Sequence, residues 1–118
     1  MRSGNSVEER IQTEMVRVAR SKGLTVFHVP NGGQRSGKEG AAFKRAGVMA
    51  GVYDLIFLLP GARTIFVEVK TKSGRISPAQ ETFGEMLDAY GFEHYIAKGL
   101  EEGLKVIDYV EHVAHRRS

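Results

Sequence analysis

Charged residues interrupt two neighbouring hydrophobic segments of the chain, at Asp54 and at Glu68 and Lys70. Asp54 precedes the apolar run Leu55–Leu59, while Glu68 and Lys70 alternate with valines in the segment Ile65–Lys70. Residues two apart in a strand point to the same face, so Glu68 and Lys70 should share one face, while Ile65 and the two valines pack on the other. Carboxylates inside strands are costly unless they are paired or bind a metal. Two carboxylates beside a lysine would suit a divalent cation that assists phosphodiester hydrolysis.

Each of these residues also has an ordinary structural explanation. Asp54 could cap the turn that follows Gly51, and for this residue alone we favour that explanation. Glu68 could form an exposed ion pair with Lys70, but its position between two valines favours a functional role. Lys70 would then orient a water molecule or stabilise charge on the phosphate.

A hard cation needs more oxygen ligands than two side chains supply. The backbone carbonyl of Val69 lies between the two charged residues of its segment and is a natural further ligand. Glu8 borders the apolar face of the first expected helix, whereas Glu9 would form a capping box with Ser6. We therefore prefer Glu8 as a ligand, although acidic residues are common at helix N-termini without any metal. Gln80 can serve as a helix cap and also contact a metal-bound water or a phosphate.

Hydrophobic periodicity and capping signals predict the elements that would position these residues. We expect helices over 6–22, 78–90 and 100–113 and strands over 24–29, 55–59, 65–70 and 92–97. The glycine-rich connection after the first strand leaves room for a short helix over 39–46. Pro60 and Gly61 suit a hairpin turn. Ser77, Pro78 and Gln80 are start signals of a helix, and Gly91 is its stop signal. This order predicts an α/β protein with a small mixed sheet flanked by helices, in which the last two strands are parallel.

Composition places the chain among ordinary globular proteins. Its 118 residues suffice for a single domain, and 42% of them are hydrophobic. The chain lacks cysteine, which excludes disulfides, thiolate metal sites and cysteine nucleophiles. No apolar run approaches the roughly 18 residues of a membrane span, and no signal peptide is evident. We therefore expect a cytoplasmic protein without membrane contacts.

Basic residues are concentrated in the connection between the first two strands. The net charge is +3, and the window 31–47 holds four basic residues against one acidic residue, which equals the whole excess. Such clustering favours a polyanion such as DNA, although a solubilising loop explains the charge equally well. We expect DNA contacts from Asn31, Gln34, Arg35, Lys38, Lys44 and Arg45, with Lys72 and Arg75 at the edge of the site.

Two other patterns carry less weight. His112 and His115 are three residues apart in the last expected helix, which could indicate a metal site. Cations near a helix C-terminus are the commoner explanation, because no third ligand follows nearby. The glycines at 32, 33 and 37 match neither a P-loop nor a dinucleotide-binding fingerprint.

The arrangement of Asp54 with Glu68-Val69-Lys70 on consecutive strands resembles the PD-(D/E)XK nuclease superfamily. Other segments resemble the VRR-NUC family, in the stand-alone form found in phages and prophages, and the resemblance implies a single nuclease domain, 1–118, with a core over about 6–112. The segments that carry the resemblance are Glu8–Gln12, Pro30–Gly33, Gly47–Leu55, Val67–Lys70 and Gly74–Gln80. Tyr53 stands where the superfamily name has proline, at a position that varies widely in such enzymes.

This resemblance implies a restriction-endonuclease-like αβββαβ core and phosphodiester hydrolysis with Mg²⁺ or Mn²⁺. The metal ligands that it implies are Asp54, Glu68 and the Val69 carbonyl, with Lys70 as the catalytic residue and Gln80 supporting the site. Glu8 matches the glutamate of the family's first helix, although the adjacent Glu9 could also align with that position. Similarity to archaeal Holliday-junction resolvases implies a homodimer acting on branched or otherwise structured DNA. The alternatives are a catalytically inactive DNA-binding module of the same fold and a purely structural domain. The presence of all three motif residues, Asp54, Glu68 and Lys70, argues against the inactive module.

Overall fold

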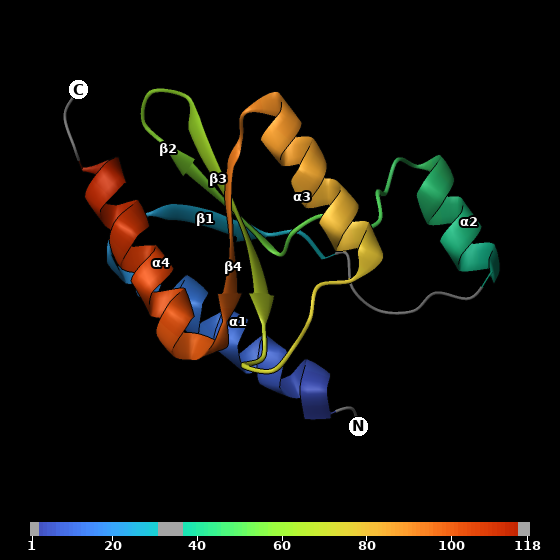
Figure 1. The fold of residues 1–118 in the computed structure, drawn as a ribbon, viewed down its shortest axis with the longest axis horizontal. Coiled ribbons are helices and arrows are strands. Elements are labelled where there is room, and N and C mark those ends of the chain that lie inside the picture. Colours follow the sequence, from blue (N-terminus) through green and yellow to red (C-terminus); the bar gives the residue numbers. More distant parts are fainter. Residues whose placement is uncertain (1–2, 31–36, 116–118) are drawn as a thin grey trace.

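The structure is a computed structural model that describes residues 3–30 and 37–115, without the side chains of residues 3–6, 37 and 38. The predicted α/β class and the predicted order of elements are confirmed (Figure 1). In chain order the elements are α1 (Ser3–Ser21), β1 (Thr25–His28), α2 (Gly37–Arg45), β2 (Leu55–Leu59), β3 (Arg63–Lys70), α3 (Pro78–Tyr90), β4 (Glu93–Lys98) and α4 (Gly99–Ala114).

The first helix differs from its prediction at the N-terminal end. Helix α1 begins at Ser3, so Ser6 lies inside the helix instead of capping it. The predicted capping box between Ser6 and Glu9 is therefore wrong. No proline stands between Ser3 and Ser6, so the backbone continues as helix past the expected cap.

The strands form one mixed sheet in the order β1-β2-β3-β4. β2 is antiparallel to both β1 and β3, and residues 60–62 make the tight turn of the β2–β3 hairpin. β4 returns through the crossover helix α3 and pairs with β3 in parallel, as predicted. The carboxyl ends of β3 and β4 therefore meet at one edge of the sheet (Figure 1).

The main hydrophobic core lies between one face of the sheet and the helices α1 and α4. The strands contribute Val26, Leu55, Phe57, Leu59, Ile65, Val67, Val69 and Ala97, and the helices contribute Met15, Ala19, Ile107, Val110 and Val113. The two helices pack closely at Gly103, where a Cβ atom would lie 2.5 Å from the Met15 sulfur. Since Ile65, Val67 and Val69 all belong to this core, the predicted division of β3 into two faces is confirmed.

Helix α3 covers part of the opposite face through a smaller aromatic cluster. Tyr53, Phe83 and Leu87 are buried there, with Phe66 packed against them. The Tyr53 ring is 1% exposed, and its centroid lies 5.3 Å from that of Phe83. Gly84 makes this packing feasible, because a Cβ atom there would lie 2.5 Å from the Tyr53 hydroxyl. Tyr53 thus anchors α3 to the sheet at the position where the superfamily name has proline.

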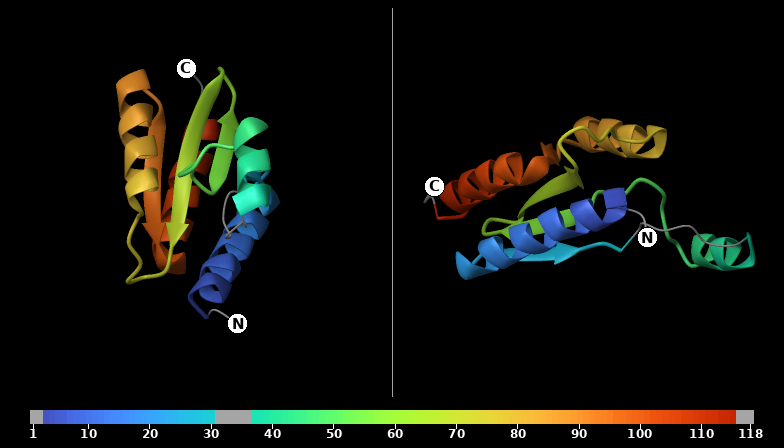
Figure 2. Two further views of the ribbon diagram at one scale, coloured as in Figure 1. Left: turned by 90° about the vertical axis from the view of Figure 1, so that its right-hand side faces the viewer. Right: turned by 90° about the horizontal axis from the view of Figure 1, so that it is seen from below.

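Helix α2 projects from the rest of the described molecule, as Figure 1 and the right-hand view of Figure 2 show. It spans only nine residues, and its last turn carries Lys44 and Arg45. In the parts of the chain that the structure describes, no helix is long and apolar enough to cross a membrane.

Candidate active site

The pairing of β2 with β3 places Asp54 beside Glu68. Leu55 pairs with Val67, so the residue before Leu55 lies opposite the residue after Val67. A Glu68 carboxylate oxygen accepts the Asp54 backbone N–H at 3.2 Å, and an Asp54 carboxylate oxygen accepts the Val69 backbone N–H at 2.9 Å. Each carboxylate is therefore oriented by the backbone of the other strand, and the two acidic groups lie close together.

Lys70 completes this group from the same face of β3. Its Nζ atom lies 3.3 Å from the Glu68 Oε2 atom. Glu68 is 2% exposed and Lys70 is 9% exposed, and they are the only buried charged residues in the described part of the chain. The ion pair foreseen as the structural explanation exists, but it is buried and not exposed. Burying an ion pair stabilises a protein weakly at best, so its presence indicates a role other than stability.

Gln80 connects the group to helix α3. The Ser77 hydroxyl accepts the Gln80 backbone N–H, and the Gln80 side-chain oxygen accepts the Ser77 backbone N–H at 2.8 Å. The predicted capping box is thus confirmed, with Pro78 in the first turn. The Gln80 side-chain nitrogen donates to Glu68 Oε2 at 2.8 Å. The Gln80 side-chain amide therefore caps the N-terminus of α3 and also orients the Glu68 carboxylate.

Gly51 holds this helix end in place, which the sequence did not indicate. Its φ angle is +87°, and a Cβ atom there would lie 2.3 Å from the Ala79 carbonyl oxygen. Only glycine permits both that backbone conformation and that contact. The segment leading to Asp54 and the first turn of α3 consequently touch, which sets the position of Gln80 relative to Asp54.

His28 is a second neighbour that sequence reasoning missed. Its Nδ1 atom lies 2.9 Å from the Asp54 backbone oxygen, which also accepts the Val29 N–H at 2.9 Å. A carbonyl oxygen only accepts hydrogen bonds, so His28 must carry its proton on Nδ1 here. A lone histidine at the end of a strand gives no sequence signal, because its contact depends on the pairing of β1 with β2.

Burial raises the pKa of both carboxyl groups. It raises the pKa of Glu68 to about 8, with the neighbouring Asp54 charge as the next cause, and Lys70 opposes the shift. Burial also raises the pKa of Asp54, against the hydrogen bond from Val69 and the nearby His28 and Lys70. With both carboxyl groups ionised, the site would contain more negative charge than its single lysine balances. An additional cation at this place would relieve that imbalance.

The donor atoms of the group fit a hard divalent cation in type. The Asp54 and Glu68 side chains supply carboxylate oxygens, and the Val69 backbone lies against Asp54. Glu8 is partly buried whereas Glu9 is exposed, which agrees with the preference for Glu8 but does not place it at the site. Within residues 3–30 and 37–115, no three His, Asp or Glu side chains lie together as a metal-binding group. Glu8 as a ligand remains a prediction.

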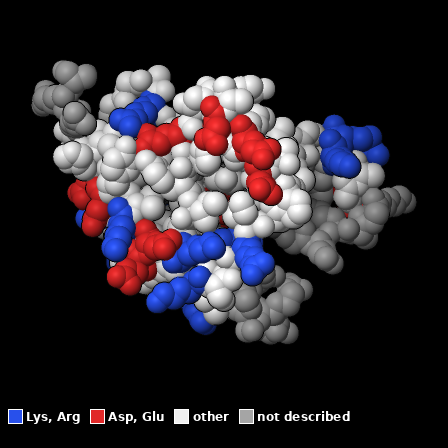
Figure 3. Space-filling view, viewed as in Figure 1, with Lys and Arg blue, Asp and Glu red and all other residues white. Residues whose placement is uncertain are grey.

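The predicted DNA-binding residues fall into three sets. Asn31, Gln34 and Arg35 lie outside the described residues, as does the Lys38 side chain. Lys44 and Arg45 are exposed on the projecting helix α2, whereas Lys72 and Arg75 are exposed between β3 and α3, next to the site. Figure 3 shows basic side chains on α2 and acidic side chains over α3. The acidic surface consists of Glu81, Glu85 and Asp88.

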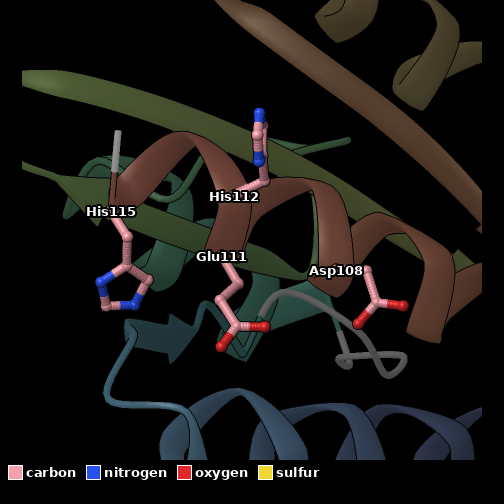
Figure 4. A pocket seen from close by; sticks show the side chains of 4 residues that line it. All are labelled: Asp108, Glu111, His112 and His115. Carbon is pink, nitrogen blue, oxygen red and sulfur yellow. The ribbon is translucent and has the colours of Figure 1, made fainter. Parts of the chain in front are cut away.

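A surface hollow on α4 contains the two C-terminal histidines. Its lining residues are Asp108, Glu111, His112 and His115 (Figure 4). His112 points away from Glu111 in that view, and Lys22 binds Glu111 at 3.0 Å and Asp108 at 3.7 Å. The carboxylates already have a cationic partner, so we assign no metal site to this hollow.

Comparison with known proteins identifies the family. The VRR-NUC domain profile matches residues 6–101, which is most of the chain. The chain belongs to the VRR-NUC family. This family is part of the PD-(D/E)XK nuclease superfamily, so the protein has a nuclease-type fold.

Two solved structures resemble this VRR-NUC chain. One, a VRR-NUC domain protein, is 29% identical with a TM-score of 0.69, covering 86% of this chain and 85% of that chain. The other, a VRR-NUC domain, is 21% identical with a TM-score of 0.62, covering 86% of this chain and 95% of that chain. A search of the curated proteins gave no match.

Proposed function

We propose that this VRR-NUC protein is a metal-dependent endonuclease that hydrolyses phosphodiester bonds in DNA. The observation that carries the proposal is the buried Glu68, whose carboxylate contacts the Asp54 backbone, Lys70 and Gln80 at once. Such a group costs stability and has no packing function, which is typical of catalytic sites.

The roles follow from the chemistry of each group. The Asp54 and Glu68 carboxylates and the Val69 carbonyl would hold Mg²⁺ or Mn²⁺. Such a cation lowers the pKa of a bound water and neutralises charge on phosphoryl oxygens. Lys70 lies beside Glu68 and can stabilise the negative charge that develops on the phosphate. Gln80 keeps the Glu68 carboxylate oriented, because its hydrogen bond is fixed by the helix cap.

The substrate proposed is branched or otherwise structured DNA, selected by shape. Lys72 and Arg75 beside the site and the basic end of α2 offer contacts to phosphates, which carry no base information. The acidic surface of α3 repels phosphates and would keep the duplex away from that side. We further propose a cytoplasmic homodimer, because a second subunit would enlarge the contact area that this small chain offers to a branched substrate.

Cleavage assays on supercoiled plasmid with a titration of Mg²⁺ and Mn²⁺ test the proposal. We expect Glu68→Gln to lower the rate about 10³-fold, because several kcal/mol of charge stabilisation are lost at tenfold per 1.36 kcal/mol. Glu93→Gln is the matched control, since Glu93 also lies in a strand but pairs with Arg63 at the far end of the sheet. Circular dichroism should show that both variants remain folded. Equal activity of Glu68→Gln and wild type would refute the assignment.

The same assay separates the alternative of an inactive DNA-binding module. That alternative predicts DNA binding with no nicking under any divalent metal. A panel of four-way junctions, flaps, splayed arms and linear duplexes then tests shape selection. Equal cleavage of linear and branched DNA would contradict the proposed preference.

A further inference from the structure

The carboxyl ends of β3 and β4 bring lysines together on the face of the sheet that carries Glu68 and Lys70. Lys70 pairs with Lys98 in the parallel register, so their backbones lie about 4.8 Å apart, the usual strand spacing. Ala97 is buried in the main core, which directs Lys98 to the opposite face, where Glu68 and Lys70 lie. No sequence motif pointed to Lys98.

Lys72 reaches the same edge from the segment after β3. Its Cα, Cβ and Cγ atoms lie 3.7–4.0 Å from the place where a Cβ atom of Gly99 would stand. Gly99 directly follows Lys98, so the stem of Lys72 rests on the junction of β4 and α4. Figure 3 shows basic side chains over this end of the strands.

These lysines differ in their partners. Lys70 is paired with Glu68, whereas neither Lys72 nor Lys98 forms an ion pair within the described residues. The nearby Glu102 carboxylate accepts the backbone N–H of Lys98 at 2.8 Å. Like charges on neighbouring strands repel each other, so two unpaired lysines beside a third reduce stability unless an anion binds there.

We propose that Lys98 and Lys72 together bind a phosphate adjacent to the scissile phosphate. This inference rests on the proposed function, because it takes the scissile phosphate to lie at Asp54, Glu68 and Lys70. Lys98 lies one strand spacing from Lys70, which is comparable to the step from one phosphate to the next along a nucleic-acid strand. The pair would thus fix the direction in which the strand crosses the site.

Binding experiments test the contact without cleavage. We expect Lys98→Ala and Lys72→Ala each to reduce the slope of log affinity against log salt, and the double variant to reduce it by about 1, because both lysines contact the same phosphate. The affinities are measured with calcium or without divalent metal, so that the binding test does not depend on whether the wild type cleaves DNA. Lys22→Ala is the control, because Lys22 pairs with Glu111 at the other end of the molecule. An unchanged slope in both lysine variants would overturn the inference.

A substrate with one uncharged methylphosphonate locates the contacted phosphate. In the wild type, the modification next to the cleaved bond on one side should lower kcat/KM about tenfold, mainly through KM. On the unmodified substrate, Lys98→Ala should already have this lower kcat/KM, and the methylphosphonate should cause no further loss in this variant. Lys98→Arg should again be sensitive to the methylphosphonate. Equal sensitivity of Lys98→Ala and wild type would refute the contact and leave the proposed function intact. A wild type that cleaves no DNA would instead refute the proposed function.

Discussion

The two faces of the sheet are built for different purposes. Among the residues that the structure describes, those buried on the face against α1 and α4 are all apolar, whereas the face partly covered by α3 buries Glu68 and Lys70. Both faces use the same strand β3, whose side chains alternate between them. One strand therefore anchors the core with Ile65, Val67 and Val69 and presents charges on its other side.

This division explains how the fold tolerates buried charges. Each fully buried aliphatic or aromatic side chain contributes about 1.5–3 kcal/mol, and the α1/α4 face contains most of them. The face under α3 has only a small aromatic cluster around Tyr53. The stability needed to hold the charged group comes mostly from the other side of the sheet. Mutations on the two faces should therefore separate stability from activity.

The largest expected effect is a loss of stability on the apolar face. Phe57→Ala should lower the free energy of unfolding by about 3–5 kcal/mol, because Phe57 is fully buried in the main core. Chemical denaturation measures this loss. Phe83→Ala, in the smaller cluster, should cost less stability but loosen α3 and so reduce cleavage. The comparison of faces fails if Phe83→Ala destabilises the protein more than Phe57→Ala does.

The next effect is a pH dependence that comes from the charged face. The folded-state pKa of Glu68 is raised to about 8, so its favourable contribution is complete below pH 4.5 and is lost as the pH rises through 8. The metal-free protein should therefore lose on the order of a few kcal/mol of unfolding free energy between pH 5 and about pH 8. Asp54 shifts the same way.

Glu68→Gln provides the control for this pH effect. The amide does not titrate, so the variant should be at least as stable as wild type at pH 8 and vary less with pH. Urea unfolding of both proteins with a chelator present gives the comparison. Parallel pH curves for the two proteins would mean that Glu68 is not the group responsible.

A smaller effect is expected from Gln80, which connects the charged face of the sheet to helix α3. Gln80→Ala removes both the hydrogen bond to Glu68 and part of the α3 cap. Loss of an orienting partner typically costs 10–100-fold in activity or metal affinity, and we expect about that loss of cleavage, with about 1 kcal/mol of stability. Ser77→Ala removes a cap hydroxyl without touching Glu68, so it should lose similar stability and much less activity. If Gln80→Ala and Ser77→Ala lost equal activity, Gln80 would act only as a helix cap and would not orient Glu68 for cleavage.

The sequence predicted the elements whose signals are local. Helix α3 was predicted at both ends, because Ser77, Pro78, Gln80 and Gly91 act within one turn of the helix boundaries. The shared face of Glu68 and Lys70 followed from the two-residue period of a strand. These features need no knowledge of distant contacts.

The contacts that join separate elements could not be predicted from the sequence. The packing of Gly51 on Ala79 and the bond from His28 to Asp54 depend on how segments distant in the chain meet. The pairing of Lys70 with Lys98 depends on the register of two parallel strands. A resemblance to a family names the motif residues, whereas these neighbours appear only after the sheet is assembled.

The smallest expected effect concerns α2, which belongs to neither face. Lys44 and Arg45 are exposed on this projecting helix, so they should contact phosphates at a distance from the site. Lys44→Ala with Arg45→Ala should reduce the salt slope of DNA affinity by about 1–2 while leaving kcat at saturating DNA close to wild type. Arg17→Ala is a control, because Arg17 is an exposed cation paired with Glu14 on α1. An unchanged slope would mean that the DNA contacts lie on the site face alone, at the ends of β3 and β4.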